Sequence, residues 1–434
     1  MSTSVSGSGT PGVSGAPGLP GPRGPIDAGR WPDVVAVPPC SAARRAAARI
    51  VVRQALNGLP LQVTMGGERL GTGGPLMEVH DPDGFLRRIG TGGLVGFGES
   101  YMAHEWDARD LVAVLAVFAE HAATLIPPSL QRLRGLWAPR KPTGQRNTPS
   151  GAQANIRHHY DLSNDLFALF LDASMSYSSA LFDPSSLPSA TWSDLETAQH
   201  RKIDRMLDLC RVGPGTRLLE IGTGWGALAI RAAARGASVH SVTLSAEQRD
   251  LARERVRAAG HEDRVRIELC DYRQVRGSYD AIASVEMIEA VGAEYWPTFF
   301  RALDSLLAPG GSVALQAITM PHDRMLASLD TFTWVHKYIF PGGQLPSVRA
   351  LEETARSHTG LRVTACDGFG AHYARTLELW RERFAEQDHA VGDLGFDPTF
   401  RRMWDFYLAY SEAGFRSGYL DVHQIQLTGE GAGL

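Results

Sequence analysis

Residues 218–317 alternate between short apolar runs, which predict strands, and longer segments with helical periodicity. The first apolar run leads into a turn with three glycines and then into a helix predicted at 227–234. The predicted strands lie at 218–221, 237–244, 265–270, 279–285, 312–317 and 419–427. Strands separated by helices are typical of an open sheet of parallel strands.

The glycine turn has the composition of a nucleotide-type binding loop. Gly222, Gly224 and Gly226 allow the backbone to bend and to approach a ligand closely, and the following helix offers unpaired N–H groups. The same pattern fits NAD, FAD or S-adenosylmethionine, and it also occurs in turns that bind nothing. The polar residues at the neighbouring strand ends must distinguish these possibilities.

Polar side chains follow the carboxyl ends of several predicted strands. The second strand ends at 243–245 without the acidic residue that a dinucleotide site places there; Ser245 instead caps the next helix, with Gln248 as its capping-box partner. The third strand is followed by 271–273 and the fourth by 286–289. Because such strand ends border the ligand crevice, this arrangement favours a methyltransferase over a dehydrogenase.

The regions on either side of this sheet are less regular. Residues 1–29 are rich in Gly, Pro and Ser and are expected to be disordered. The next segment predicts a helix at 42–56, strands at 61–65 and 76–80, and a helix at 110–125. Arg44, Arg45, Arg49 and Arg53 of the first helix favour a solvated face over a lipid-headgroup patch. After residue 317 the helices are rich in aromatic residues, which form either core or the lining of an acyl-chain tunnel.

The composition excludes several classes of protein. With 434 residues, 44% of them hydrophobic, the chain can build a large core and two domains. A net charge of -4 argues against a general nucleic-acid binder. No apolar run is long enough to span a membrane, and the first residues do not have the pattern of a signal peptide.

No metal site is predicted. His158, His159 and Asp161 lie close together, but their spacing is poor for a metal ion. The cysteines, which also lack metal-ligand spacing, are expected to be thiols in a reducing cytoplasm; they are Cys40, Cys210, Cys270 and Cys366.

A series of motifs extends over most of the chain after about residue 30. They lie at 159–164, 175–180, 202–204, 220–226, 242–245, 284–292, 338–343 and 372–377. In this order they resemble the cyclopropane-fatty-acyl-phospholipid synthase family, which includes the mycolic-acid methyltransferases. Further motifs at 30–32, 96–102, 318–321 and 410–421 resemble the branch that methylates oleoyl chains on the way to 10-methylstearic (tuberculostearic) acid.

The resemblance implies an α/β fold with a Rossmann-like class I methyltransferase sheet, an apolar helical cap and a small mixed α/β N-terminal domain. The expected divisions are a tail at 1–29, the N-terminal domain at 30–135, a polar linker at 136–154, and the methyltransferase domain with its lipid-binding cap at 155–429.

The resemblance also implies a site for S-adenosylmethionine, assigned part by part. Its expected residues are Gly222, Gly224, Gly226, Tyr177 and Ser178 at the methionine part, Thr243, Leu244 and Gln248 at the ribose, Asp271 and Tyr272 at the adenine, and Glu220 in a supporting role, while Asp204 is expected to be structural.

In the family a bicarbonate ion beside the methyl group accepts protons. The resemblance assigns it to the side chains of Glu289, Gln316 and Tyr373 and to the backbone of Ser179 and Ile318. Many cyclopropane-forming members have cysteine at position 179 and histidine at position 316. Serine preserves a backbone contact, and glutamine still donates a hydrogen bond, but Gln316 cannot titrate. This change can alter how the reaction ends.

The implied reaction is methylation of the cis double bond of an oleoyl chain on a phospholipid, giving a 10-methylene stearoyl chain. No flavin or nicotinamide site is evident, so reduction is assigned to a separate enzyme. A homo-oligomer in the cytoplasm, peripheral to the inner face of the membrane, is expected. A cyclopropane synthase and a non-catalytic subunit that binds lipid or cofactor remain alternatives; a small-molecule or RNA methyltransferase lacks support.

Overall fold

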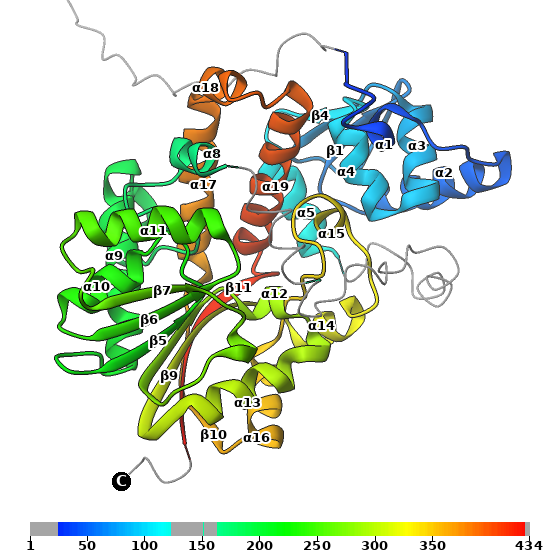
Figure 1. Cartoon of the computed structure of the whole chain (residues 1–434). Helices are drawn as coiled ribbons and strands as arrows, with labels where there is room; N and C mark the ends of the chain where they lie inside the picture. Colours follow the sequence, from blue (N-terminus) through cyan, green and yellow to red (C-terminus); the bar gives the residue numbers. More distant parts are fainter. Residues whose placement is uncertain (1–24, 123–150, 152–162, 430–434) are drawn as a thin grey trace, which may run out of the picture.

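The computed structural model describes residues 25–122, 151 and 163–429. A seven-stranded sheet lies at the centre of residues 163–429, in the order β10-β11-β9-β8-β5-β6-β7 (Figure 1). The strands are β5 (Arg217–Ile221), β6 (Ser238–Thr243), β7 (Val265–Leu269), β8 (Tyr279–Val285), β9 (Leu307–Thr319), β10 (Leu361–Gly368) and β11 (Asp421–Gly429). Strands β5 to β9 are parallel, and β11 runs antiparallel to both β9 and β10. The predicted α/β fold class is confirmed.

The chain reverses direction across the sheet at β5, which pairs with β6 on one side and β8 on the other. In open α/β sheets such a switch point opens a crevice beyond the carboxyl ends of the strands. Apolar cores lie on both faces of the sheet, with α9 (Trp192–Leu209), α10 (Ala227–Ala234) and α11 (Ala246–Ala258) on one face and α13 (Trp296–Leu306) and α16 (Val348–His358) on the other. Short helices α12 (Ile288–Val291) and α14 (His322–Ser328) follow β8 and β9.

A group of apolar helices lies beyond this edge of the sheet and forms the cap (Figure 1). It consists of α8 (Asn164–Phe170), α15 (Trp334–Tyr338), α17 (Gly370–Glu386), α18 (Asp388–Asp393) and α19 (Pro398–Arg416). Trp380 of α17 and Trp404 of α19 are each at most 1% exposed. The aromatic side chains of these helices therefore form part of a large apolar core.

The N-terminal region forms a second, smaller sheet in the order β2-β1-β3-β4. Its elements are α1 (Pro32–Val35), α2 (Ala42–Asn57), β1 (Gln62–Met65), β2 (Glu68–Leu70), β3 (Leu76–Val79), α3 (Pro82–Gly92), α4 (Leu94–Met102), β4 (Trp106–Ala108) and α5 (Leu111–Glu120). The sequence predicted α2, β1, β3 and α5 but not the others. The domain divisions stay a prediction, because residues 1–24 and the linker region except residue 151 lie outside the described residues.

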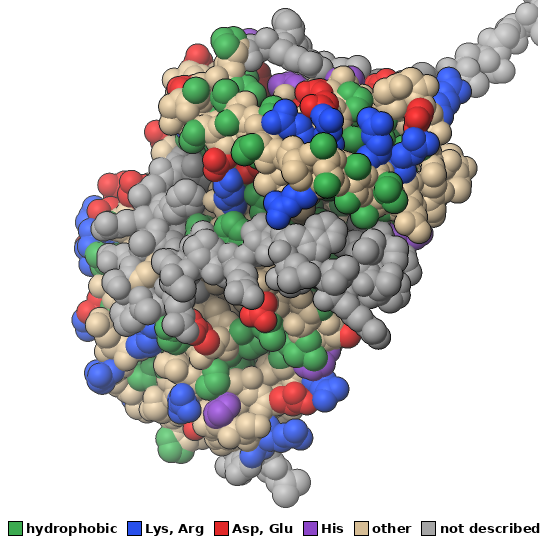
Figure 2. Space-filling model, turned by 90° about the vertical axis from the view of Figure 1, so that its right-hand side faces the viewer, with side chains coloured by type: hydrophobic (Ala, Val, Ile, Leu, Met, Phe, Trp, Pro, Cys, Tyr) green, Lys and Arg blue, Asp and Glu red, His purple; other side chains and the backbone are tan. Residues whose placement is uncertain are grey.

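Charges of both signs are mixed on the surface of the N-terminal region (Figure 2). On α2, Arg45 is paired with Asp83 at 2.8 Å and Arg53 with Glu68 at 3.0 Å. This pairing favours a solvated helix face over a headgroup patch. Among the described residues, no helix combines the length and the apolar character that crossing a membrane requires.

Helix α4 joins the N-terminal region to the cap. Glu99 accepts hydrogen bonds from Lys337 at 2.5 Å and from Tyr338 at 2.9 Å. Arg402 of α19 reaches back to the carbonyl oxygens of Tyr101 and Trp106. One apolar core runs without interruption from the N-terminal region through the cap. The motif at 96–102, which carries part of the resemblance to the tuberculostearic branch, therefore lies at the interface between the N-terminal region and the cap.

This interface predicts a matched pair of glycine substitutions. A Cβ at Gly98 would lie 2.3 Å from Cδ1 of Trp334, whereas at Gly92 the nearest atom is the Cβ of Val95 at 3.9 Å. Gly98→Ala should lower the free energy of unfolding by about 1–3 kcal/mol, because the core must shift. Gly92→Ala should be neutral or slightly stabilising. Urea denaturation measures both, and equal stability of the two variants would contradict the close packing of α4 against α15.

Candidate active site

The glycine turn after β5 has a backbone that only glycine adopts easily. The φ angles of Gly222, Gly224 and Gly226 are 98°, 52° and 88°. No atom lies within 4 Å of the place where a Cβ at Gly224 would stand, so the backbone is open there. At Gly222 a Cβ would lie 2.5 Å from the side chain of Met287. An open turn that leads into α10 fits the close approach of S-adenosylmethionine.

Glu220 lies under this turn and is 3% exposed. Its Oε2 accepts a hydrogen bond from the hydroxyl of Ser241 at 2.5 Å, and that hydroxyl is 2.7 Å from the hydroxyl of Thr223. Burial raises the pKa of Glu220 to about 8, with the Ser241 hydrogen bond acting in the opposite direction. Glu220 therefore joins β5 to β6 beneath the loop.

The residues assigned to the ribose and adenine lie at the ends of β6 and β7. The hydroxyl of Thr243 donates to Oε1 of Gln248 at 3.3 Å, and Leu244 is partly buried beside them. The carboxylate of Asp271 is paired with Arg273 at 2.6 Å, a partner that the sequence analysis did not include. The ring of Tyr272 lies edge-on to Phe299 at a centroid distance of 5.2 Å.

The segment with Tyr177 and Ser178 lies between the cap and α9. The hydroxyl of Tyr177 is 2.8 Å from that of Tyr407, and its ring is 5.3 Å from that of Trp380. The hydroxyl of Ser178 accepts a hydrogen bond from Lys202 at 2.5 Å. Burial lowers the pKa of Lys202 to about 8, opposed first by the charge of Glu286. The sequence placed Lys202 in a motif but gave it no role in the site.

A carboxylate stands at the centre of the residues assigned to bicarbonate. Oε1 of Glu286 accepts hydrogen bonds from the backbone N–H of Ser179 at 3.0 Å and from Nε2 of Gln316 at 2.8 Å. Oε2 accepts from the hydroxyl of Tyr373 at 2.7 Å. The Ser179 hydroxyl donates to the carbonyl of Ala180 instead, so this residue contributes its backbone. The sequence analysis placed Glu286 at the strand end that borders the crevice, three residues before Glu289, but gave it no role in the site.

The amide of Gln316 is held in one orientation. Its Oε1 accepts a hydrogen bond from Nε2 of Gln424 at 3.0 Å, and Gln424 also donates to the carbonyl of Lys202 at 3.2 Å. The NH₂ group of Gln316 therefore faces Glu286. Burial raises the pKa of Glu286, while Lys202 and the hydrogen bonds from Gln316, Tyr373 and Ser179 oppose that rise. Burial and the charge of Glu286 raise the pKa of Tyr373 well above its usual value.

A second carboxyl group lies close by. Oε1 of Glu289 accepts the backbone N–H of Ile318 at 2.5 Å. Its Oε2 is shielded from solvent and has no hydrogen-bond partner within the described parts of the chain. Burial and then the charge of Glu286 raise the pKa of Glu289 to about 8. The two carboxyl groups thus have different surroundings.

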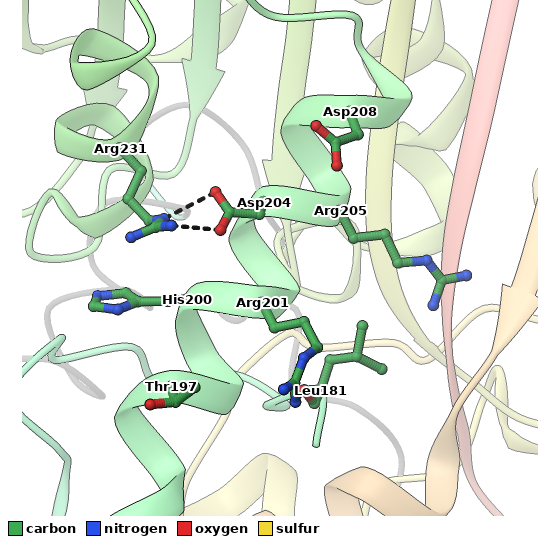
Figure 3. Close-up of a pocket in the computed structure, with 8 residues that line it drawn as sticks. All are labelled: Leu181, Thr197, His200, Arg201, Asp204, Arg205, Asp208 and Arg231. Carbon is green, nitrogen blue, oxygen red and sulfur yellow. Dashed lines mark hydrogen bonds and ion pairs between the residues drawn. The ribbon is translucent and has the colours of Figure 1, made fainter. Parts of the chain in front are cut away.

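A separate surface cavity of about 520 Å³ lies over α9 and α10 (Figure 3). Its positive charges have partners: Arg231 is bonded to Asp204, and Arg205 is paired with Asp367 at 2.6 Å. Asp204 therefore has a structural pairing. Over the described ranges, no cluster of His, Cys, Asp and Glu residues is arranged to hold a metal ion. The residues His158, His159 and Asp161 lie outside those ranges.

Comparisons with known proteins show which family the chain is similar to. The family model of mycolic acid cyclopropane synthetase matches residues 147–425. The chain is 53% identical to tuberculostearic acid methyltransferase UfaA1 of Mycobacterium tuberculosis over 94% of this chain and 98% of the relative. It is 34% identical to cyclopropane-fatty-acyl-phospholipid synthase of Escherichia coli over 80% and 86% of the respective chains.

Solved structures agree with these relatives. Cyclopropane synthase MmaA2 from Mycobacterium tuberculosis aligns with a TM-score of 0.57 at 32% identity, covering 63% of this chain and 97% of that one. Mycolic acid cyclopropane synthase CmaA1, in complex with SAH and CTAB, aligns with a TM-score of 0.58 at 31% identity, covering 66% and 98%. The predictions of the family and of an S-adenosylmethionine-dependent methyltransferase are therefore confirmed: this chain belongs to the mycolic acid cyclopropane synthetase family.

Proposed function

We propose that this chain transfers a methyl group from S-adenosylmethionine to the cis double bond of an oleoyl chain on a phospholipid and forms a 10-methylene stearoyl chain. The observation that carries the proposal is a pair of partly buried carboxyl groups, Glu286 and Glu289, after β8 at the edge of the sheet that bears the glycine turn, one of them bonded to Tyr373 of the cap. The relative that is 53% identical, a tuberculostearic acid methyltransferase, supports the same product class.

The aromatic side chains around the carboxyl pair suit an alkene. S-Adenosylmethionine supplies an electrophilic methyl group, and an alkene is a weak nucleophile that must be held in line with it away from water. The ring of Tyr373 lies 4.5 Å from that of Phe415 and 6.2 Å from that of Trp380. Aromatic faces attract cations by roughly 0.5–2 kcal/mol, so these rings would stabilise the positive charge left after methyl transfer.

The two carboxyl groups have different charges in this proposal. Burial raises the pKa of Glu286, but its three hydrogen-bond donors and the positive charge of Lys202 oppose that rise and favour the ionised form. Glu289 has one backbone donor and an unpartnered oxygen, so its protonated form is favoured at neutral pH. A pair of carboxyl groups whose environments separate their pKa values is a common arrangement for proton transfer.

Several finer expectations stay predictions. Saturation of a methylene group needs a hydride donor that methyl transfer does not supply, so a separate reductase is retained. A phospholipid substrate requires access to the membrane surface, and a homo-oligomer remains the expected assembly. Bicarbonate also remains an expectation of the family resemblance, and no step proposed for this chain passes through it.

The product tests the proposed function. Incubation of the purified chain with S-adenosylmethionine and oleoyl phospholipid should increase the acyl mass by one CH₂, and NMR should show an exocyclic alkene. Cyclopropane protons in place of that alkene would instead identify a cyclopropane synthase. No product with any unsaturated phospholipid, together with measurable cofactor binding by titration calorimetry, would support a non-catalytic binding subunit.

The protonation of Glu289 predicts a pH effect on stability. The pKa of Glu289 in the folded chain is about 8, above that of an unfolded glutamate. Its contribution to the free energy of unfolding is therefore complete at low pH and is lost as the pH rises through 8. Between pH 7 and pH 9, the free energy of unfolding should therefore fall by about 1 kcal/mol less in Glu289→Gln than in the wild type. Urea denaturation at each pH measures the free energy of unfolding. If this free energy changes with pH equally in both proteins, Glu289 is already ionised at pH 7.

A further inference from the structure

We propose that the carboxylate of Glu286 is itself the base that accepts the proton in the last step of the reaction, in the place that the family resemblance assigns to bicarbonate. This inference rests on the proposed alkene methylation and concerns the group that ends it. It assigns a catalytic role to a residue that the sequence analysis did not include in the site.

The hydrogen-bond donors assigned to bicarbonate are already used by carboxyl groups of the chain. Glu286 accepts hydrogen bonds from the N–H of Ser179, the amide of Gln316 and the hydroxyl of Tyr373. Glu289 accepts one from the N–H of Ile318. A bicarbonate ion would have to displace Glu286 from its donors and would then stand beside a second negative charge. Like charges in a shielded site repel strongly. The residues present therefore do not fit the ion.

The position of Glu286 is maintained by several parts of the chain. Gln424 orients the amide of Gln316, and the hydroxyl of Thr376 accepts the N–H of Ala180, next to Ser179. Lys202 is 1% exposed and donates a hydrogen bond to Ser178, next to Ser179; burial raises the pKa of Glu286, and the positive charge of Lys202 opposes that rise. A base held by fixed donors needs no rearrangement when the reaction begins.

The backbone at Glu286 gives an independent indication. Its φ angle is 51°, in the left-handed region that glycine adopts freely and other residues adopt at an energetic cost. Such conformations concentrate at functional sites, where the surrounding structure enforces them. Here the strained residue is the one whose side chain reaches the donors of Ser179, Gln316 and Tyr373. The unfavourable backbone conformation therefore occurs at the residue that carries the proposed base.

The proposed step balances atoms and charge. The alkene electron pair bonds to the methyl carbon, the bond from that carbon to sulfur breaks, and S-adenosylhomocysteine and a carbocation remain. A hydride shift moves the cation to the carbon that bears the new methyl group. A methyl C–H bond then supplies the electrons of the exocyclic double bond, and its proton passes to Glu286. The proton is released to water before the next turnover, and no oxidant or reductant is needed.

The first test compares wild type with Glu286→Gln in buffer stripped of carbon dioxide and in the same buffer with added bicarbonate. Wild type should be equally active in both. Glu286→Gln should bind S-adenosylmethionine with an unchanged affinity by calorimetry but lose about 100-fold or more in kcat, because an amide cannot accept the proton. Glu262→Gln, at a carboxylate 66% exposed beside the amino ends of the strands, should behave as wild type.

The second test uses Glu286→Gly, which suits the backbone and leaves space beside Ser179, Gln316 and Tyr373. Formate or bicarbonate should restore its activity in a saturable manner, whereas neither should stimulate wild type. Wild-type activity that requires bicarbonate, an active Glu286→Gln variant, or a Glu286→Gly variant that no anion restores would each overturn the proposal. If wild type alkylates no unsaturated phospholipid at all, the proposed function fails instead.

Discussion

The hydrogen bonds to the carboxylate of Glu286 connect the parts of the chain that build the site. The N–H of Ser179 comes from the segment before α9, the amide of Gln316 from β9 and the hydroxyl of Tyr373 from α17. A shielded negative charge without such partners would strongly destabilise the fold. The sheet, the segment at 176–182 and the cap must therefore be assembled together before the site exists.

The N-terminal region contributes to the site by supporting the cap. Arg402 binds backbone oxygens of that region, and Phe406 of the same helix packs 4.8 Å from the ring of Trp334. Helix α19 in turn packs along α17, which carries Tyr373. Because the apolar core is continuous from the N-terminal region to α17, the cap is a fixed wall that can keep water from a carbocation.

The sequence predicted the sheet well because its parallel strands are short apolar runs with polar residues at their ends. That pattern placed Asp271 and Glu289 at the carboxyl edge of the sheet, whereas Gln316 was assigned through the family resemblance. The bond between Glu286 and Tyr373 joins residues 87 apart, and no local pattern encodes such a pairing. Strand β10 was missed because much of it is exposed at the edge of the sheet. Helix α4 was missed because its glycines have low helix propensity, which packing against Trp334 overrides.

The central claim is that the chain's own carboxylate occupies the proton-accepting position. A high-resolution crystal structure with S-adenosylhomocysteine, grown in bicarbonate, measures this directly. The account predicts that the Glu286 carboxylate remains bonded to Ser179, Gln316 and Tyr373 and that no separate trigonal anion lies among them. A planar ion bonded to Gln316 and Tyr373, with the Glu286 side chain turned away, would contradict it.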